Sequence, residues 1–220
     1  MHHEFREFVD VDALARAAAA FVAERARLAV RATGEFNFAV SGGHTPWKMF
    51  AELTSFDMPW GETAIYQVDD RVAPEGDAER NLTSLRDSLA TVHPTIMAMP
   101  VNDLDLEAAA LRYGSSLPGR FDLVHLGLGS DGHTASLVPG DHVLEISDRL
   151  IALTDQYQGR RRMTMTYYAL ERADQLLWLI TGSDKRVPLS LLLKGDTSIP
   201  AGRVRATRSL VMADLAAVEP

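Results

Sequence analysis

Short apolar runs alternate with longer amphipathic stretches along most of this 220-residue chain. Strands are expected at residues 36–40, 63–68, 95–99, 121–126, 150–153, 176–180 and 209–212. Helices are expected between several of them, at residues 13–32, 46–53, 78–89, 104–116 and 183–193. Strands that alternate with helices build a mostly parallel sheet with helices on both faces. The prediction is therefore a three-layer α/β fold, formed as a single domain of residues 1–220.

The first expected helix shows how its buried face is predicted. Asp10 or Asp12 is available as its cap, and Gly34 follows its end. A period near 3.6 predicts that its core positions are Leu14, Ala17, Phe21, Leu28 and Ala32.

Composition excludes several classes of protein. The chain has no cysteine, so it has no disulfide framework, thiol nucleophile or thiolate metal site. Its apolar runs are far shorter than the ~20 residues that span a bilayer, and acidic residues near the start argue against a signal peptide. We therefore expect a soluble, cytoplasmic protein with no membrane partner.

The charge pattern argues against nucleic acid as a partner. The net charge is −8, and the only basic run is Arg160–Arg162, next to Gly159. A phosphate-backbone binder normally carries a longer basic stripe. We interpret the three arginines as a solvated turn.

In a Rossmann-like sheet of this kind, ligands bind outside the carboxyl ends of the strands. The first loop there contains Ser41, Gly42, Gly43, His44, Thr45 and Pro46. Two glycines allow close backbone approach, Thr45 is a good N-cap and Pro46 suits the first helical position. The result is a candidate phosphate site at a helix N-terminus, or else an ordinary strand-to-helix turn.

The second loop follows the strand that ends at Val68 and begins Asp69-Asp70-Arg71. A carboxylate and a guanidinium here can orient a substrate and hold a phosphate. The alternative is a surface salt-bridge cluster. Further along, Asp77, Arg80 and Asn81 indicate the start of the next helix, with Asp77 as its expected cap.

The third loop, residues 127–140, reads GLGSDGHTASLVPG. Its start matches the dinucleotide fingerprint G-x-G-x-x-G, but Pro139-Gly140 interrupts the helix which that fingerprint requires. What remains is a histidine on a glycine-rich loop. His133 is a candidate general base, three nearby glycines are expected to leave room for substrate, and N–H groups of residues 129–132 are candidate oxyanion donors. Asp131 either orients His133 or caps the loop.

Two further features concern metals and cations. The spacing of His125, His133 and His142 matches no zinc motif, so no metal site is expected. The fourth loop places Lys185, one of three lysines in the chain, in the first turn of a helix. The helix dipole disfavours a cation there, which indicates either a lysine placed for an anionic ligand or a chance position.

Together and in this order, the four loops resemble the 6-phosphogluconolactonase family, which is itself similar to glucosamine-6-phosphate deaminases and isomerases. The block from Asp131 to Leu137 followed by Pro139-Gly140 is the most specific part. The loops at Ser41–Pro46, at Asp69–Arg71 with Pro74, and at Gly182 with Lys185 support it.

The resemblance implies hydrolysis of 6-phospho-D-glucono-1,5-lactone to 6-phosphogluconate in the oxidative pentose phosphate pathway, with no cofactor. It implies that His133 is the base and that Arg71 and Lys185 hold the phosphate, with N–H donors from the glycine loop. Asp69 matches the acid that handles the substrate proton in the deaminases. The expected partner is thus a sugar-phosphate lactone, bound by a monomer or weak homo-oligomer.

Differences from the family pattern bear on the alternatives. The deaminases resemble Asp-Glu-Tyr where this chain has Asp69-Asp70-Arg71, which favours the lactonase. His44 replaces a usual serine, and Tyr167-Tyr168 replace a usual Leu-Pro. The alternatives are a deaminase or isomerase of the same fold, and a non-catalytic sugar-phosphate sensor.

Overall fold

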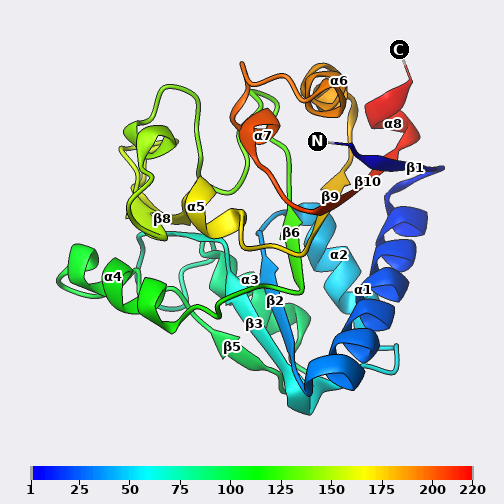
Figure 1. Ribbon diagram of the computed structural model, residues 1–220, viewed down its shortest axis with the longest axis horizontal. Coiled ribbons are helices and arrows are strands. Elements are labelled where there is room, and N and C mark those ends of the chain that lie inside the picture. The colour runs from blue at the N-terminus through cyan, green and yellow to red at the C-terminus, as the bar shows by residue number, and fades with distance from the viewer. Residues whose placement is uncertain (1, 220) are drawn as a thin grey trace.

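The computed structural model describes residues 2–219 and contains a seven-stranded, fully parallel sheet (Figure 1). Its strand order is β1-β10-β9-β6-β2-β3-β5. The bounds are β1 (Glu4–Phe8), β2 (Phe36–Val40), β3 (Thr63–Gln67), β5 (Thr95–Met97), β6 (Leu123–Leu126), β9 (Gln175–Ile180) and β10 (Arg208–Asp214). The predicted mostly parallel α/β fold is confirmed.

Helices cover both faces of this sheet, because alternate strand residues point to opposite sides. One face packs against α1 (Val11–Thr33), α2 (His44–Leu53) and α3 (Asn81–Ser88). The other packs against α4 (Leu106–Ser116), α5 (Tyr167–Leu170), α6 (Arg186–Lys194), α7 (Pro200–Arg203) and α8 (Leu215–Val218). Short 3₁₀ helices η1 (Trp60–Glu62), η2 (His142–Glu145) and η3 (Ser183–Lys185) complete the elements.

Helix α1 begins and ends as predicted, but only part of its predicted apolar face is buried. The Asp10 side chain accepts a hydrogen bond from the Ala13 N–H at 2.8 Å, and Gly34 ends the helix with φ +87°. Leu14 is buried, whereas Leu28 is 40% exposed and Ala32 is exposed. The buried stripe consists mostly of alanines, because small side chains let the helix lie close to the sheet and to α2. It is formed by Leu14, Ala15, Ala18, Ala19, Val22, Ala23, Ala26 and Ala29.

A second, antiparallel sheet lies beside the first and was not predicted. Its order is β4-β8-β7, with β4 (Asp69–Arg71), β7 (Ile151–Leu153) and β8 (Arg162–Met165). The predicted strand at 150–153 therefore exists, but it belongs to this small sheet. Pairing of Asp69 with Thr164 joins residues 95 positions apart in the chain, and such a contact leaves no local pattern.

The order of the large sheet also locates a crevice. From β2 the chain proceeds to β3 and β5 on one side, and later to β6, β9 and β10 on the other. The boundary between β2 and β6 is therefore a topological switch point, where α/β folds bind ligands.

Within residues 2–219, no helix is both long enough and apolar enough to cross a lipid bilayer.

Candidate active site

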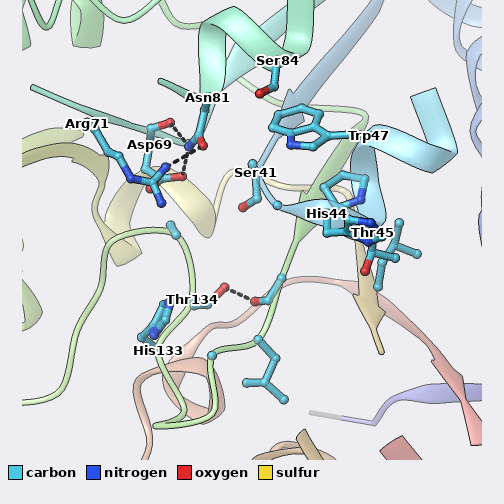
Figure 2. Close-up of a pocket in the computed structure, with 18 of the residues that line it drawn as sticks. Ser41, His44, Thr45, Trp47, Asp69, Arg71, Asn81, Ser84, His133 and Thr134 are labelled. Carbon is cyan, nitrogen blue, oxygen red and sulfur yellow. Dashed lines mark hydrogen bonds between the residues drawn. The ribbon is translucent and has the colours of Figure 1, made fainter. Parts of the chain in front are cut away.

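A cavity of about 680 Å³ opens at this switch point. It is lined by the loops that follow β2, β3, β6 and β9, which are the four loops singled out in the sequence. In Figure 2, Asp69, Arg71 and Asn81 face Ser41 across the cavity, with His133 below them. The structure thus brings the predicted residues to one site.

The glycine loop forms one wall. Gly43 has φ +132°, a conformation that favours glycine, and it is the N-cap of α2. A Cβ at Gly42 would lie 2.0 Å from Asn81 Oδ1, so this position also needs glycine. Thr45, predicted as the N-cap, instead lies inside the helix, and its hydroxyl contacts Thr181 Oγ1 at 2.7 Å. The helix N-terminus therefore opens into the cavity with no side-chain cap.

Asn81, which the sequence suggested only as part of a helix start, organises the opposite wall. Its Nδ2 donates to the Asp69 carbonyl at 3.0 Å and lies 3.3 Å from Asp69 Oδ1. Its Oδ1 accepts from Arg71 Nη1 at 3.1 Å, and the same guanidinium donates to the Glu79 carbonyl at 2.9 Å. Arg71 is thus held in a fixed direction beside the glycine loop.

Beneath this wall lies a buried ion pair rather than a surface cluster. Asp70 Oδ2 accepts from Arg80 Nε at 3.1 Å, and these side chains are 0% and 2% exposed. Asp70 Oδ1 accepts from the backbone N–H groups of Arg71 and Asn81 at 2.9 and 2.8 Å. Asp70 therefore caps the start of α3, which is the role expected of Asp77. The Asp77 carboxylate instead accepts a hydrogen bond from the Glu79 N–H.

Asp69 is buried in the cavity wall and accepts a 2.6 Å hydrogen bond from the Ser136 hydroxyl. Burial raises its pKa above the ordinary value, although Ser136 and the nearby Arg162 charge lower it in part. A raised carboxyl pKa means that ionising Asp69 costs folding free energy at neutral pH.

We therefore expect Asp69→Asn to be more stable than the wild type at pH 7, by about 2–4 °C in melting temperature. The advantage should shrink below about pH 4, where the wild-type carboxyl is protonated in both the folded and the unfolded chain. Thermal melts at pH 7 and pH 3.5 check this. Equal destabilisation at both pH values would contradict it.

His133 lies on the loop after β6 and faces the cavity. Its Nδ1 is 2.6 Å from Asp131 Oδ1, and its backbone N–H donates to the same oxygen at 3.1 Å. Asp131 thus both orients the ring and closes the loop. Burial raises the pKa of Asp131, but hydrogen bonds and charge from His133 outweigh it and lower that pKa overall. An ionised carboxylate favours the tautomer with Nδ1 protonated, which leaves Nε2 as the free base.

At two of three positions, the glycines of this loop make room for neighbouring side chains rather than for the substrate. A Cβ at Gly129 would lie 2.1 Å from His133 Nδ1, and one at Gly132 would lie 2.6 Å from Ile199. Only Gly127 borders open space. The N–H groups of Gly129 and Gly132 donate to the carbonyls of His133 and Gly129, so neither is an oxyanion donor. No α-helix follows Gly132, as the interrupting Pro139 predicted, and the next helical element is the short 3₁₀ helix η2.

Lys185 closes the cavity from the side of β9. It ends η3, directly before α6, and its Nζ pairs with Asp184 at 2.8 Å. The Thr45–Thr181 contact joins its loop to the glycine loop. Lys185 and Arg71 therefore flank the N-terminus of α2 from the two neighbouring loops.

Arg162 is a cavity residue that the sequence interpretation missed. The solvated turn expected at residues 160–162 is wrong at this position, because Arg162 is 5% exposed in β8 and lines the cavity. The alternation of Arg162 and Thr164 with Met163 and Met165 was the available strand signal.

The three histidines considered for a metal lie in separate environments. His125 is buried in β6, and burial lowers its pKa to about 3. Its Nδ1 lies 3.3 Å from the Ser41 N–H donor, so the neutral ring supports the glycine loop. His142 lies beside Asp141 and Asp155 on an exposed turn.

Known proteins resemble this chain in sequence and in fold. The family model described as "Glucosamine-6-phosphate isomerases/6-phosphogluconolactonase" matches residues 9–212. A 6-phosphogluconolactonase of Nostoc sp. is 31% identical over 74% of this chain and 73% of its own. One of Mycobacterium bovis is 31% identical over 94% of each chain. The crystal structure of 6-phosphogluconolactonase from Thermotoga maritima superposes with a TM-score of 0.87 over 96% of this chain and 99% of that one, at 24% identity, and supports the fold.

The matched residues include strands β2, β3, β5, β6 and β9, most of β10, and the four loops that line the cavity. The chain therefore belongs to the glucosamine-6-phosphate isomerase/6-phosphogluconolactonase family.

Proposed function

We propose that this protein hydrolyses 6-phospho-D-glucono-1,5-lactone to 6-phosphogluconate. The observation that carries the proposal is the placement of the His133–Asp131 pair in the same cavity as an uncapped helix N-terminus. The His133–Asp131 pair is suited to activating water, and the helix N-terminus is suited to binding a phosphate monoester. Cytoplasmic location and a monomeric or weakly homo-oligomeric state stay predictions.

In this proposal, His133 Nε2 takes a proton from a water molecule while the water oxygen bonds to the lactone carbonyl carbon. The carbonyl oxygen becomes an oxyanion. When it collapses, the bond from carbon to ring oxygen breaks, and the imidazolium returns its proton to the ring oxygen. Asp131 keeps the ring oriented and stabilises the imidazolium.

The remaining residues bind and place the substrate. The N–H groups of residues 42–45 and the cations Lys185 and Arg71 hold the phosphate at the α2 end. Asp69, with its raised pKa, is placed to accept or donate a hydrogen bond to a sugar hydroxyl. Such positioning affects kcat as well as KM, because binding energy away from the reacting carbon orients the lactone.

The test is lactone disappearance at neutral pH, with 6-phosphogluconolactone made in situ and compared with its spontaneous hydrolysis. Acceleration by the wild type supports the proposal. A folded protein that gives no acceleration but releases ammonia from glucosamine 6-phosphate would assign it to the deaminases. Neither activity, with sugar-phosphate binding retained, would indicate a sensor.

Lys185→Ala should reduce kcat/KM for the phosphorylated lactone by about 10–100-fold, because a charge-assisted phosphate contact is lost. The effect should be nearly absent with unphosphorylated glucono-1,5-lactone. Lys194→Ala is the matched control, since Lys194 is exposed at the other end of α6. An equal loss with both lactones would place Lys185 outside the phosphate site.

A further inference from the structure

The loop of residues 154–161 between β7 and β8, here called the strap, brings a tyrosine to the edge of the cavity. The backbone groups of Tyr157 and Arg160 pair with each other at 3.0 and 3.3 Å. The two residues between them, Gln158 and Gly159, both have positive φ, at +52° and +81°. This is the geometry of a two-residue hairpin turn with a well-defined direction. Arg160 also pairs with acidic side chains of the 77–79 segment, which fixes the strap against the wall of the site.

From this turn, Tyr157 reaches the catalytic pair. Its hydroxyl donates to Asp131 Oδ2 at 3.1 Å and lies 3.5 Å from His133 Nδ1. The two rings meet edge to face, with centroids 5.6 Å apart. The two oxygens of Asp131 are therefore divided, one facing His133 and the other Tyr157, so the carboxylate cannot rotate without losing a partner.

The ring of Tyr157 is itself held in place by Arg162. The Arg162 guanidinium lies 4.9 Å from its centroid, and Arg162 Nη2 donates to Gln158 Oε1 at 2.9 Å. Burial raises the pKa of Tyr157, and the charge of Asp131 raises it further, so the hydroxyl keeps its proton as a donor. The positive charge of Arg162 also lowers the pKa of Asp69 in part, and Asp69 lies on β4, the strand paired with β8.

We infer that Tyr157 is a positioning residue that fixes the Asp131 carboxylate and the His133 ring in their reactive arrangement. The inference rests on the proposed lactonase function. Tyr157 does more than fill space, because its hydroxyl withdraws negative charge from the carboxylate that faces His133. Removing only that hydroxyl leaves the carboxylate more strongly negative, which favours the protonated imidazolium.

Tyr157→Phe is the test, with Tyr168→Phe as control, since Tyr168 is 46% exposed and lies under Arg172 away from the cavity. We expect Tyr157→Phe to lower kcat about three- to tenfold with KM within twofold. The midpoint of the acidic limb of the kcat/KM profile should move to higher pH by about 0.3–0.5 unit. Tyr157→Leu, which also removes the ring, should lose more activity, and the control should match the wild type.

A second readout is independent of turnover. The His133 imidazole can be followed by NMR in histidine-labelled protein and assigned by its absence in His133→Asn. Its titration midpoint should move upward in Tyr157→Phe. A wild-type kcat and an unmoved midpoint would overturn the inference, as would a loss of activity without any change in midpoint, which would mark a structural role. If the wild type itself fails to accelerate lactone hydrolysis, the proposed function fails, and the NMR titration alone decides the role of Tyr157.

Discussion

Replacing His133 with asparagine should lower kcat by about 10²–10⁴-fold, the range typical for loss of a general acid–base group. Asparagine retains a polar side chain of similar reach, but it cannot take a proton from water. Because His133 is partly exposed at the cavity surface, with 23% of its side chain accessible, the fold should persist. The measurement is the rate of lactone disappearance above the spontaneous rate, together with a thermal melt of the same sample.

The matched control is His142→Asn. His142 is also a histidine beside aspartates, but its side chain is 55% exposed and it lies outside the cavity. It should keep wild-type kcat. Full activity in His133→Asn would reject His133 as the base, and an equal loss in both variants would point to a general effect of histidine replacement.

The largest stability effect is expected at Asp70. Asp70→Ala leaves the Arg80 guanidinium buried without its partner and removes the acceptor of two backbone N–H groups. Breaking a buried pair in this way costs about 3–5 kcal/mol, a large share of the ~5–15 kcal/mol that stabilises a typical domain. The melting temperature should fall by roughly 6–20 °C.

A double variant separates the ion pair from the other roles of Asp70. In Asp70→Ala/Arg80→Met the stranded charge is gone, so stability should partly return. The Arg71 and Asn81 N–H groups remain without their acceptor, so the wall of the cavity and its activity should not recover. If Asp70→Ala unfolds at the wild-type temperature, the pair adds nothing to stability.

Much of the fold could be predicted because its central strands are local apolar runs. Strands β2, β3, β5, β6, β9 and β10 each appear in the sequence within a few residues of their ends. Of the small sheet only β7 could be found in this way, since β4 reads Asp-Asp-Arg and β8 begins with an arginine. Such residues become strand-forming and buried only when distant partners, such as Asp69 and Arg162, compensate each other's charge.

The residues of the site also divide into those with a local sequence signal and those that depend on distant contacts. Loop motifs identified Ser41, His133 and Lys185 because glycines and a family pattern surround them. Asn81 and Tyr157 have no such motif around them. Asn81 contacts both Arg71 and Asp69, and Tyr157 contacts both Asp131 and His133. Residues that support a site through contacts between distant segments are visible only once those segments are placed.

The edge strand β1 has a consequence for how the protein is made. In the described sheet, β1 pairs with β10 alone, from Glu4 beside Leu210 to Phe8 beside Asp214. During translation this first strand must wait, unpaired, until the last strand has left the ribosome. Glu4, Arg6 and Glu7 supply charges that discourage pairing with other nascent chains in that interval. The sequence of β1 is thus suited to its long exposure before folding as well as to its final place at the rim.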